Sequence, residues 1–178
     1  PYRQENQTLK ILTYNVRAFN LYNWVHFEEA KDSMFRFIMH EDPDIICFQE
    51  YYSQEKGVFA SSDLYRLLKK TPYRHIHYTI GENRNSHYGI ATFSSYPVVG
   101  SGVIHFENTI NIAIYTDINF NGDTLRIFNS HLQSIHMIKR NYAFMDSLRL
   151  RYSDQQLQEI LDISFRLKDA YIKRAEQA

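Results

Sequence analysis

The sequence has little of what marks several protein classes. It contains a single cysteine, Cys47, so no disulfide can form within the chain. No apolar run approaches the roughly 20 residues needed to cross a bilayer, and no basic segment leads into a short apolar stretch with a small-residue cleavage site. The sequence therefore predicts a soluble chain without a signal peptide or transmembrane segment, and it leaves the cellular location open.

An excess of charge is also absent. Twenty Lys and Arg balance 20 Asp and Glu, so no global positive field attracts nucleic acid, although a groove could still be basic locally. What is present favours a core: 44% of the 178 residues are hydrophobic, which suffices for one domain. Pro1 at the start and the helical character of residues 174–178 indicate that both ends continue in a longer protein.

The first 50 residues predict a strand, a helix and a second strand. Residues 9–15 are rich in strand formers, residues 28–39 have apolar side chains at helical spacing before Pro43, and residues 44–49 form a continuous apolar run. Such a run is typical of a strand covered on both faces, so Cys47 should be a buried, unreactive thiol. A right-handed crossover would make the strands parallel and place Asn15 and Glu50 at neighbouring carboxyl ends, the edge where open α/β sheets bind ligands.

The rest of the chain predicts short antiparallel strands and two helices. Asn121-Gly122 is a strong hairpin signal, because both positions tolerate positive φ. One helix is predicted over residues 62–70 and a long last helix from an N-cap at Ser153 or Asp154, after a loop or short helix over 134–152. The strands are predicted at residues 74–79, 89–94, 98–106, 109–119 and 124–129.

Three polar residues at predicted strand ends could carry chemistry. The Glu50 carboxylate could bind a metal, pair with a cation or be merely exposed, and one glutamate suits Mg²⁺, which keeps several waters. Asn15 could donate to a phosphate oxygen, hold the glutamate in place or form a turn. His131, at the end of an inner strand, could contact a phosphoryl oxygen, or it could be structural, and Asn129 should point to the opposite face. Arg17 receives low weight, because exposed arginines are common.

The order of four motifs resembles the endonuclease/exonuclease/phosphatase superfamily, whose members are deoxyribonuclease I-like. The motifs are Thr13-Tyr-Asn-Val16, Pro43-Asp-Ile-Ile-Cys-Phe-Gln-Glu50, Tyr88-Gly-Ile-Ala-Thr-Phe-Ser-Ser-Tyr-Pro-Val98 and Asn129-Ser-His-Leu132. The resemblance implies a four-layer α/β sandwich with Mg²⁺ or Mn²⁺ at the sheet edges. It also implies that Glu50 binds the metal, that Asn15 supports metal and phosphate, and that His131 contacts the scissile phosphate during attack by water.

The later motifs of that superfamily are missing from this sequence. Gly122-Asp-Thr-Leu125 falls in the predicted hairpin turn and Ser153-Asp-Gln155 opens the last helix, so neither replaces the family's Gly-Asp-x-Asn or Ser-Asp-His. We therefore interpret residues 1–178 as the N-terminal part of such a domain. Its predicted fold is α/β, half of the four-layer sandwich, with one mixed, largely antiparallel sheet and flanking helices.

Two consequences follow from this interpretation. The complete protein should be a metal-dependent phosphoesterase acting on a nucleic acid, phospholipid or inositol phosphate, whereas this fragment should be inactive; the alternative is a non-catalytic binding module. The sheet should expose an apolar face, which predicts self-association or a complementing C-terminal half.

Overall fold

The computed structural model describes the chain except for residues 1–7, 23–28, 84, 108, 135–153 and 178. It divides into two compact units, Pro1–His131 and Leu132–Ala178. The strands of the first unit are β1 (Ile11–Asn15), β2 (Ile45–Gln54), β3 (Tyr73–Asn83), β4 (Ser86–Ser94), β5 (Val98–His105), β6 (Ile112–Phe120) and β7 (Asp123–Ser130). Its helices are the short η1 (Arg17–Asn20), α1 (Ala30–Glu41) and α2 (Ser61–Leu67).

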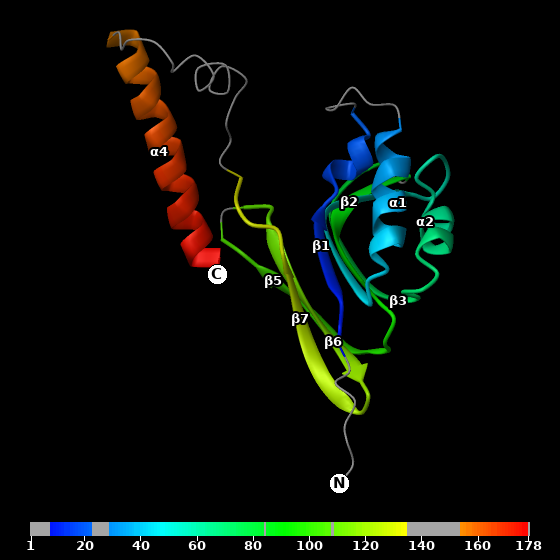
Figure 1. The fold of residues 1–178 in the computed structure, drawn as a ribbon. Coiled ribbons are helices and arrows are strands. Elements are labelled where there is room, and N and C mark those ends of the chain that lie inside the picture. The colour runs from blue at the N-terminus through cyan, green and yellow to red at the C-terminus, as the bar shows by residue number, and fades with distance from the viewer. Residues whose placement is uncertain (1–7, 23–28, 84, 108, 135–153, 178) are drawn as a thin grey trace. The chain divides into compact units, whose positions relative to one another are not determined.

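The described strands form two sheets (Figure 1). One has the order β1-β2-β4-β3, with β1 and β2 parallel as predicted and the other pairs antiparallel, and the second has the order β5-β6-β7 and is antiparallel throughout. The predicted α/β class is confirmed, but the strands divide between two sheets where one was predicted. The hairpin turn is also confirmed, since Asn121 has φ 55° and Gly122 has φ 98° between β6 and β7.

One face of the four-stranded sheet is covered by the helices (Figure 1). Helix α1 buries Ala30, Phe35 and Ile38, whose spacing places them on one side of the helix. It ends at Glu41, and the following residue, Asp42, takes a left-handed conformation (φ 47°) directly before Pro43. Phe35 and Ile38 pack in one cluster with apolar side chains of β2 and β4, which is the larger core of the unit.

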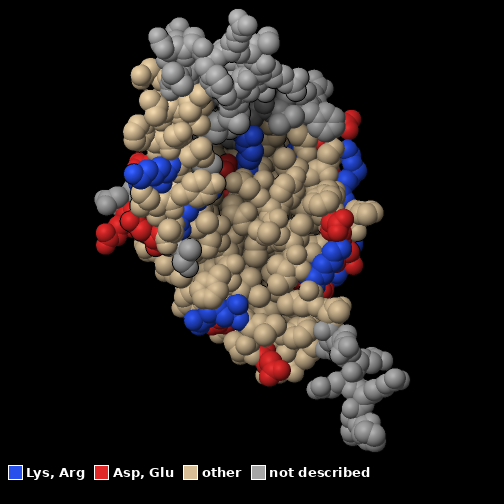
Figure 2. Space-filling view, turned by 60° about the vertical axis from the view of Figure 1, so that its left-hand side comes forward, with Lys and Arg blue, Asp and Glu red and all other residues tan. Residues whose placement is uncertain are grey.

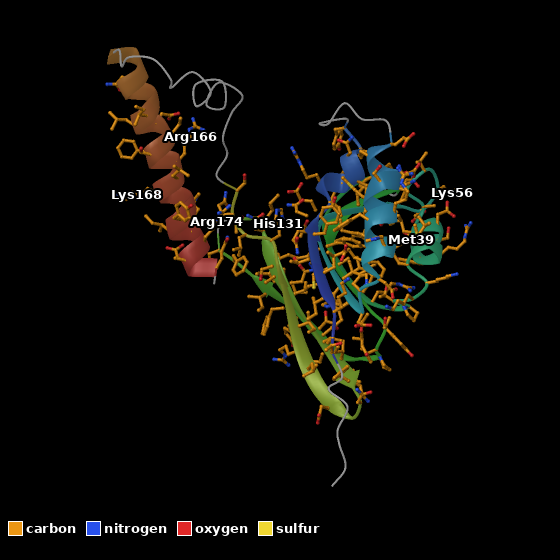
Figure 3. All side chains as sticks on the ribbon, in the orientation of Figure 1. Met39, Lys56, His131, Arg166, Lys168 and Arg174 are labelled. Carbon is orange, nitrogen blue, oxygen red and sulfur yellow. The ribbon has the colours of Figure 1, made fainter. Side chains whose placement is uncertain are left out.

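The other face of the four-stranded sheet packs on the three-stranded sheet, and side chains fill the space between them (Figure 3). Ile45 and Cys47 of β2 lie against Ile118 of β6. Ile90 of β4 packs in the same way with Ile112 and Ile114. The apolar sheet face that was predicted to be exposed is therefore covered in this chain, because the sheet of strands β5 to β7 packs against it.

The second unit contains one described helix, α4 (Asp154–Gln177). The predicted last helix is confirmed and begins at Asp154, but its predicted N-cap stays a prediction, because Ser153 and nearly all of the predicted loop over 134–152 lie outside the described residues. Within the unit, Arg174 Nε donates to the carbonyl oxygen of Gln133 over 2.7 Å. No helix in the described part of the chain is both long and apolar enough to span a membrane.

Candidate active site

Asn15 ends β1 with both atoms of its side-chain amide engaged. Its Nδ2 donates to Oε1 of Glu50 over 2.7 Å, and its Oδ1 accepts from the backbone N–H of Arg17 over 3.0 Å. A flipped amide would place two oxygens together and two N–H groups together, so the contacts fix this orientation. Of the roles considered for Asn15, the geometry supports two, since Nδ2 holds the glutamate in place and Oδ1 forms a turn with Arg17.

A left-handed turn follows β1. The four residues from Arg17 to Asn20 have φ values of 45°, 49°, 52° and 60°, and none is glycine. This conformation costs an L-residue roughly 1–2 kcal/mol, so the surrounding structure must stabilise it. Ala18 and Phe19 provide that stabilisation, since they are 3% and 1% exposed.

Phe19 is the anchor of the left-handed turn. Its ring stacks on Phe35 with 5.2 Å between centroids, and it contacts the edges of Phe48 and Tyr51 at 5.9 Å and 6.0 Å. Such ring pairs add about 0.5–1.5 kcal/mol each beyond the area that they bury. Burial of Phe19 therefore offsets the strain of the turn and fixes the backbone beside Asn15.

Glu50 lies in a β-bulge, and not at the end of a strand. The predicted strand end at Gln49 is wrong, because β2 continues to Gln54. Phe48 pairs with Ala91 and Tyr51 with Gly89, so two residues of β2 oppose the single residue between those partners. Glu50 takes φ 51° at this point. The bulge interrupts the alternation of side chains along the strand.

The bulge decides where the carboxylate lies. Phe48 and Tyr51 are both buried in the core under the helices, although regular alternation would place residues three apart on opposite faces. In an unbroken strand Glu50 would share a face with Phe48, and its charge would be buried in that core. The bulge instead directs Glu50 to the rim, where 36% of its side chain is exposed.

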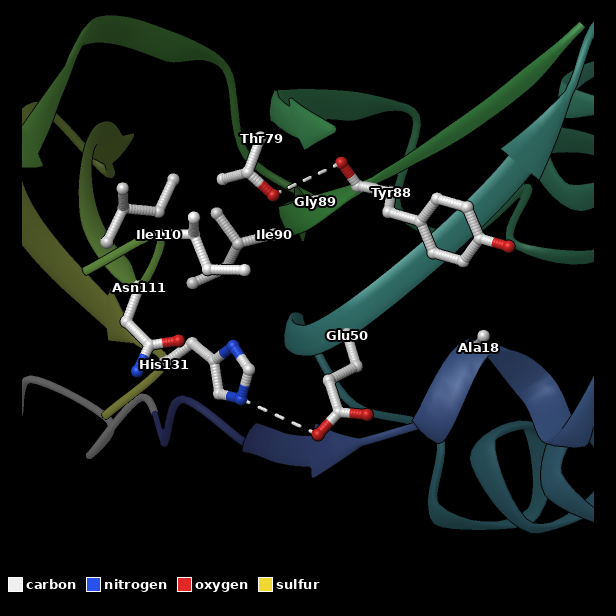
Figure 4. Close-up of a pocket in the computed structure, with 10 residues that line it drawn as sticks. Ala18, Glu50, Thr79, Tyr88, Gly89, Ile90, Ile110, Asn111 and His131 are labelled. Carbon is white, nitrogen blue, oxygen red and sulfur yellow. Dashed lines mark hydrogen bonds and ion pairs between the residues drawn. The ribbon is translucent and has the colours of Figure 1, made fainter. Parts of the chain in front are cut away.

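His131 meets Glu50 from the other sheet. Its Nε2 lies 3.5 Å from Oε1 of Glu50, and the ring is at the end of β7 (Figures 3 and 4). The backbone N–H of His131 donates to the carbonyl oxygen of Ile112 over 3.0 Å, which extends the β6–β7 ladder by one residue. Strand β7 is an edge strand of its sheet, so the prediction of an inner strand is wrong. The predicted convergence of Asn15, Glu50 and His131 on one rim is nevertheless what the structure has.

The contacts around Glu50 favour its ionised form. Chiefly the hydrogen bond with His131 holds the pKa of the Glu50 carboxyl below its usual value, and the hydrogen bond from Asn15 acts in the same direction. Partial burial opposes them, and the charge of Arg17 adds a smaller lowering of the pKa. The site thus holds a carboxylate that stays negative at neutral pH.

A buried amide pair lies behind these residues, and the sequence analysis missed it. Nε2 of Gln49 donates to Oδ1 of Asn129 over 2.7 Å, and Nδ2 of Asn129 donates to the carbonyl oxygen of Ala91 over 3.0 Å. Asn129 is 1% exposed, so the prediction that it points away from this side is wrong. The pair joins the two sheets next to Glu50 and His131. Its signal in the sequence was a polar residue within each apolar strand run.

The donor set for a metal is small. The described residues leave Oε2 of Glu50 without a hydrogen bond, so this oxygen could bind a cation. No group of three or more His, Cys, Asp or Glu side chains lies together in the described part of the chain. A single carboxylate fits a hard ion such as Mg²⁺ that keeps most of its waters, and it fits zinc poorly.

Comparisons with known proteins agree with this fold. A model of the endonuclease/exonuclease/phosphatase family matches residues 12–170. No curated protein is significantly similar in sequence. Among solved structures, an endonuclease/exonuclease/phosphatase from Beutenbergia cavernae DSM 12333 is similar with a TM-score of 0.57 and 17% identity over 86% of this chain.

Two further solved structures share the fold at low identity. Sphingomyelinase C from Streptomyces griseocarneus has a TM-score of 0.52 and 16% identity over 82% of this chain. TDP2 from D. rerio, complexed with single strand DNA product, has a TM-score of 0.52 and 16% identity over 79% of this chain. The chain spans only part of each of these structures, namely 43% of the Beutenbergia protein, 61% of the sphingomyelinase and 52% of TDP2.

Proposed function

Because the chain belongs to the endonuclease/exonuclease/phosphatase family, we propose that the complete protein is a metal-dependent phosphoesterase that hydrolyses a phosphodiester or phosphomonoester. The observation that carries the proposal is the meeting of Asn15, Glu50 and His131 from two different sheets, with 2.7 Å and 3.5 Å between the contacting atoms. A carboxylate for a cation beside an imidazole for a phosphoryl oxygen is suited to phosphate-ester hydrolysis.

Each of the three side chains has one role in this proposal. Glu50 would hold Mg²⁺ or Mn²⁺, which would supply Lewis-acid stabilisation of charge at the phosphoryl oxygen. Asn15 positions the carboxylate by donating to Oε1. His131 presents Nε2 at the rim, where it can donate to a phosphoryl oxygen and help to neutralise charge in the transition state.

The distribution of charged side chains does not favour a polynucleotide over other phosphate-ester substrates. Lys and Arg are balanced by Asp and Glu over the sequence, and in Figure 2 several of the blue Lys and Arg groups lie beside red Asp and Glu groups. The similar structures include one named as a sphingomyelinase and one complexed with DNA. Nucleic acid, phospholipid and inositol phosphate therefore all stay within the proposal.

We propose further that this chain alone hydrolyses phosphate esters only negligibly. Its described residues bring one carboxylate and one imidazole to the rim, and the imidazole already faces the carboxylate. A general base to activate water would have to come from elsewhere. We propose that a further segment or a second copy supplies it along β1 and β7, which each pair with only one strand in the described sheets.

Hydrolysis of bis(p-nitrophenyl) phosphate tests this function. In Mg²⁺ the complete protein should turn over the ester, and Glu50→Gln or His131→Ala should lower kcat by about 100-fold or more. Glu55→Gln removes an exposed carboxylate outside the site and should leave kcat unchanged. This chain alone should show negligible turnover. A complete protein that is inactive with every metal tested would favour the alternative, a non-catalytic binding module.

A further inference from the structure

A pocket of about 210 Å³ opens beside the Glu50–His131 pair (Figure 4). Strands β3, β4 and β6 form its wall together with the connection that precedes β6. Glu50 and His131 lie at its lip, so a phosphate held at these two residues would have the pocket directly next to it. A substituent of that phosphate could enter the pocket without leaving the site.

Three isoleucines give the pocket an apolar wall. Ile90 and Ile112 belong to the core between the sheets and are 1% and 4% exposed, so their positions are fixed. Ile110 stands at the opening and is 68% exposed, beside Ile90 in Figure 4. Core packing accounts for Ile90 and Ile112, but it does not account for a largely exposed isoleucine at the mouth of a pocket.

The charges of the lining exclude a second phosphate. Among the described residues that line the pocket there is no Lys or Arg, and Glu50 is the single carboxylate. A further phosphodiester of a polynucleotide would find no cation here, and it would be desolvated against isoleucine side chains. An uncharged apolar group would instead remove the isoleucine surface from water.

We propose that this pocket is the subsite for an uncharged apolar substituent of the phosphate ester, about the size of one aromatic ring. The size follows from the volume, since an engineered apolar cavity of roughly 150 Å³ accepts benzene. The inference rests on the proposed function, because it assumes that the phosphate is held at Glu50 and His131. It narrows the substrate to an ester in which an apolar group adjoins the scissile phosphate.

The experiment compares phenyl phosphate with methyl phosphate in Mg²⁺, followed by NMR of isoleucine methyl groups in this chain. Phenyl phosphate should bind at least about tenfold more tightly, since each apolar carbon that is fully removed from water is worth a severalfold gain in affinity and the pocket is open on one side. The methyl signals of Ile90, Ile110 and Ile112 should move most. Ile110→Ser should reduce the preference to about twofold, while Val58→Ser, at a loop residue 70% exposed, should keep it.

The controls separate this inference from the proposed function. Methyl phosphate binding that depends on Glu50, without any preference for phenyl phosphate, would leave the function standing and overturn the subsite. If neither phosphate binds, the premise that this chain holds the phosphate at Glu50 and His131 fails. The subsite is then tested on its own by benzyl alcohol without metal, followed through the same isoleucine methyl signals. If benzyl alcohol selectively shifts the methyl signals of the three pocket isoleucines, and Ile110→Ser abolishes these shifts, the subsite is supported. Shifts no larger than those of Ile118 would overturn it.

Discussion

Gln49 and Asn129 form a direct side-chain hydrogen bond of 2.7 Å that links the two sheets beneath the Glu50–His131 rim. Gln49 lies in β2 directly before Glu50, and Asn129 lies in β7 two residues before His131. Both side chains are buried, at 9% and 1% exposure. The distance between the carboxylate and the imidazole therefore depends on a polar contact that neither site residue makes itself.

Asn129→Ala should destabilise the first unit by about 2–4 kcal/mol, because it removes a buried side chain that accepts from Gln49 and donates to the carbonyl oxygen of Ala91. Ser130→Ala, one residue further and exposed, should change stability by less than about 0.5 kcal/mol. Urea unfolding of both variants measures the difference. Equal stabilities would show that the amide pair does not hold the sheets.

The left-handed turn predicts that glycine is tolerated better at Ala18 than at an alanine in a regular strand. Ala18 has φ 49°, where glycine is free of the steric cost that alanine bears, whereas Ala91 is an equally buried strand residue without positive φ. Both changes lose one buried methyl group. Ala18→Gly should therefore leave a protein at least about 1 kcal/mol more stable than Ala91→Gly does. Thermal or urea unfolding measures this, and the reverse order would contradict a strained turn.

Acid should weaken the contribution of Glu50 to stability. The pKa of its carboxyl lies below the usual 4.5 in the folded protein, so the unfolded chain takes up the proton first as pH falls. The stabilisation by the Glu50 carboxylate is complete above the pKa that Glu50 has in the unfolded chain. It is lost as pH falls through the lower pKa of the folded protein. At neutral pH the free energy of unfolding of wild type should exceed that of Glu50→Gln by less than about 1 kcal/mol, because the Glu50 side chain is more than a third exposed. Unfolding of both proteins is measured from pH 7 to pH 3. A difference in stability between wild type and Glu50→Gln that stays constant over this range would contradict a stabilising role for these contacts.

Cys47 should be unreactive in the folded chain. It is 4% exposed between the sheets, and burial raises the pKa of its thiol to about 11. At pH 8 only about one thiol in a thousand would then be the reactive thiolate. Ellman's reagent should react at least about 100-fold more slowly with the native protein than with the protein in guanidinium chloride. Rapid reaction of the native protein would show that the two sheets open readily.

Much of this architecture follows from local pattern. The apolar runs around Tyr14 and Phe48, the helix before Pro43 and the turn at Asn121 were predicted correctly, because each depends on residues close in sequence. The pairing of the first two strands followed from the crossover between them. The meeting of Asn15 and Glu50 followed from this pairing, because Asn15 lies opposite Gln49, next to Glu50, although β2 does not end there.

What the pattern did not reveal depends on contacts between distant residues. The bulge at Glu50 arises because Phe48 and Tyr51 both pack under the helices, and a glutamate at positive φ carries no signal for that. Asn129 resembles any polar residue near a strand end until Gln49 is seen opposite it. The division into two sheets depends on how β4 and β5 connect, which the strand runs alone do not determine.

Binding of Mn²⁺ to this chain, measured by calorimetry near pH 7, tests the central claim that Glu50, held by Asn15 and faced by His131, is a metal site. Wild type should bind one ion weakly, Glu50→Gln should lose at least about tenfold in affinity, and Asn15→Ala should lose less, because it removes only a positioning contact. Glu55→Gln should bind as wild type does. Equal affinity of wild type and Glu50→Gln, or loss of binding on Glu55→Gln alone, would contradict the account.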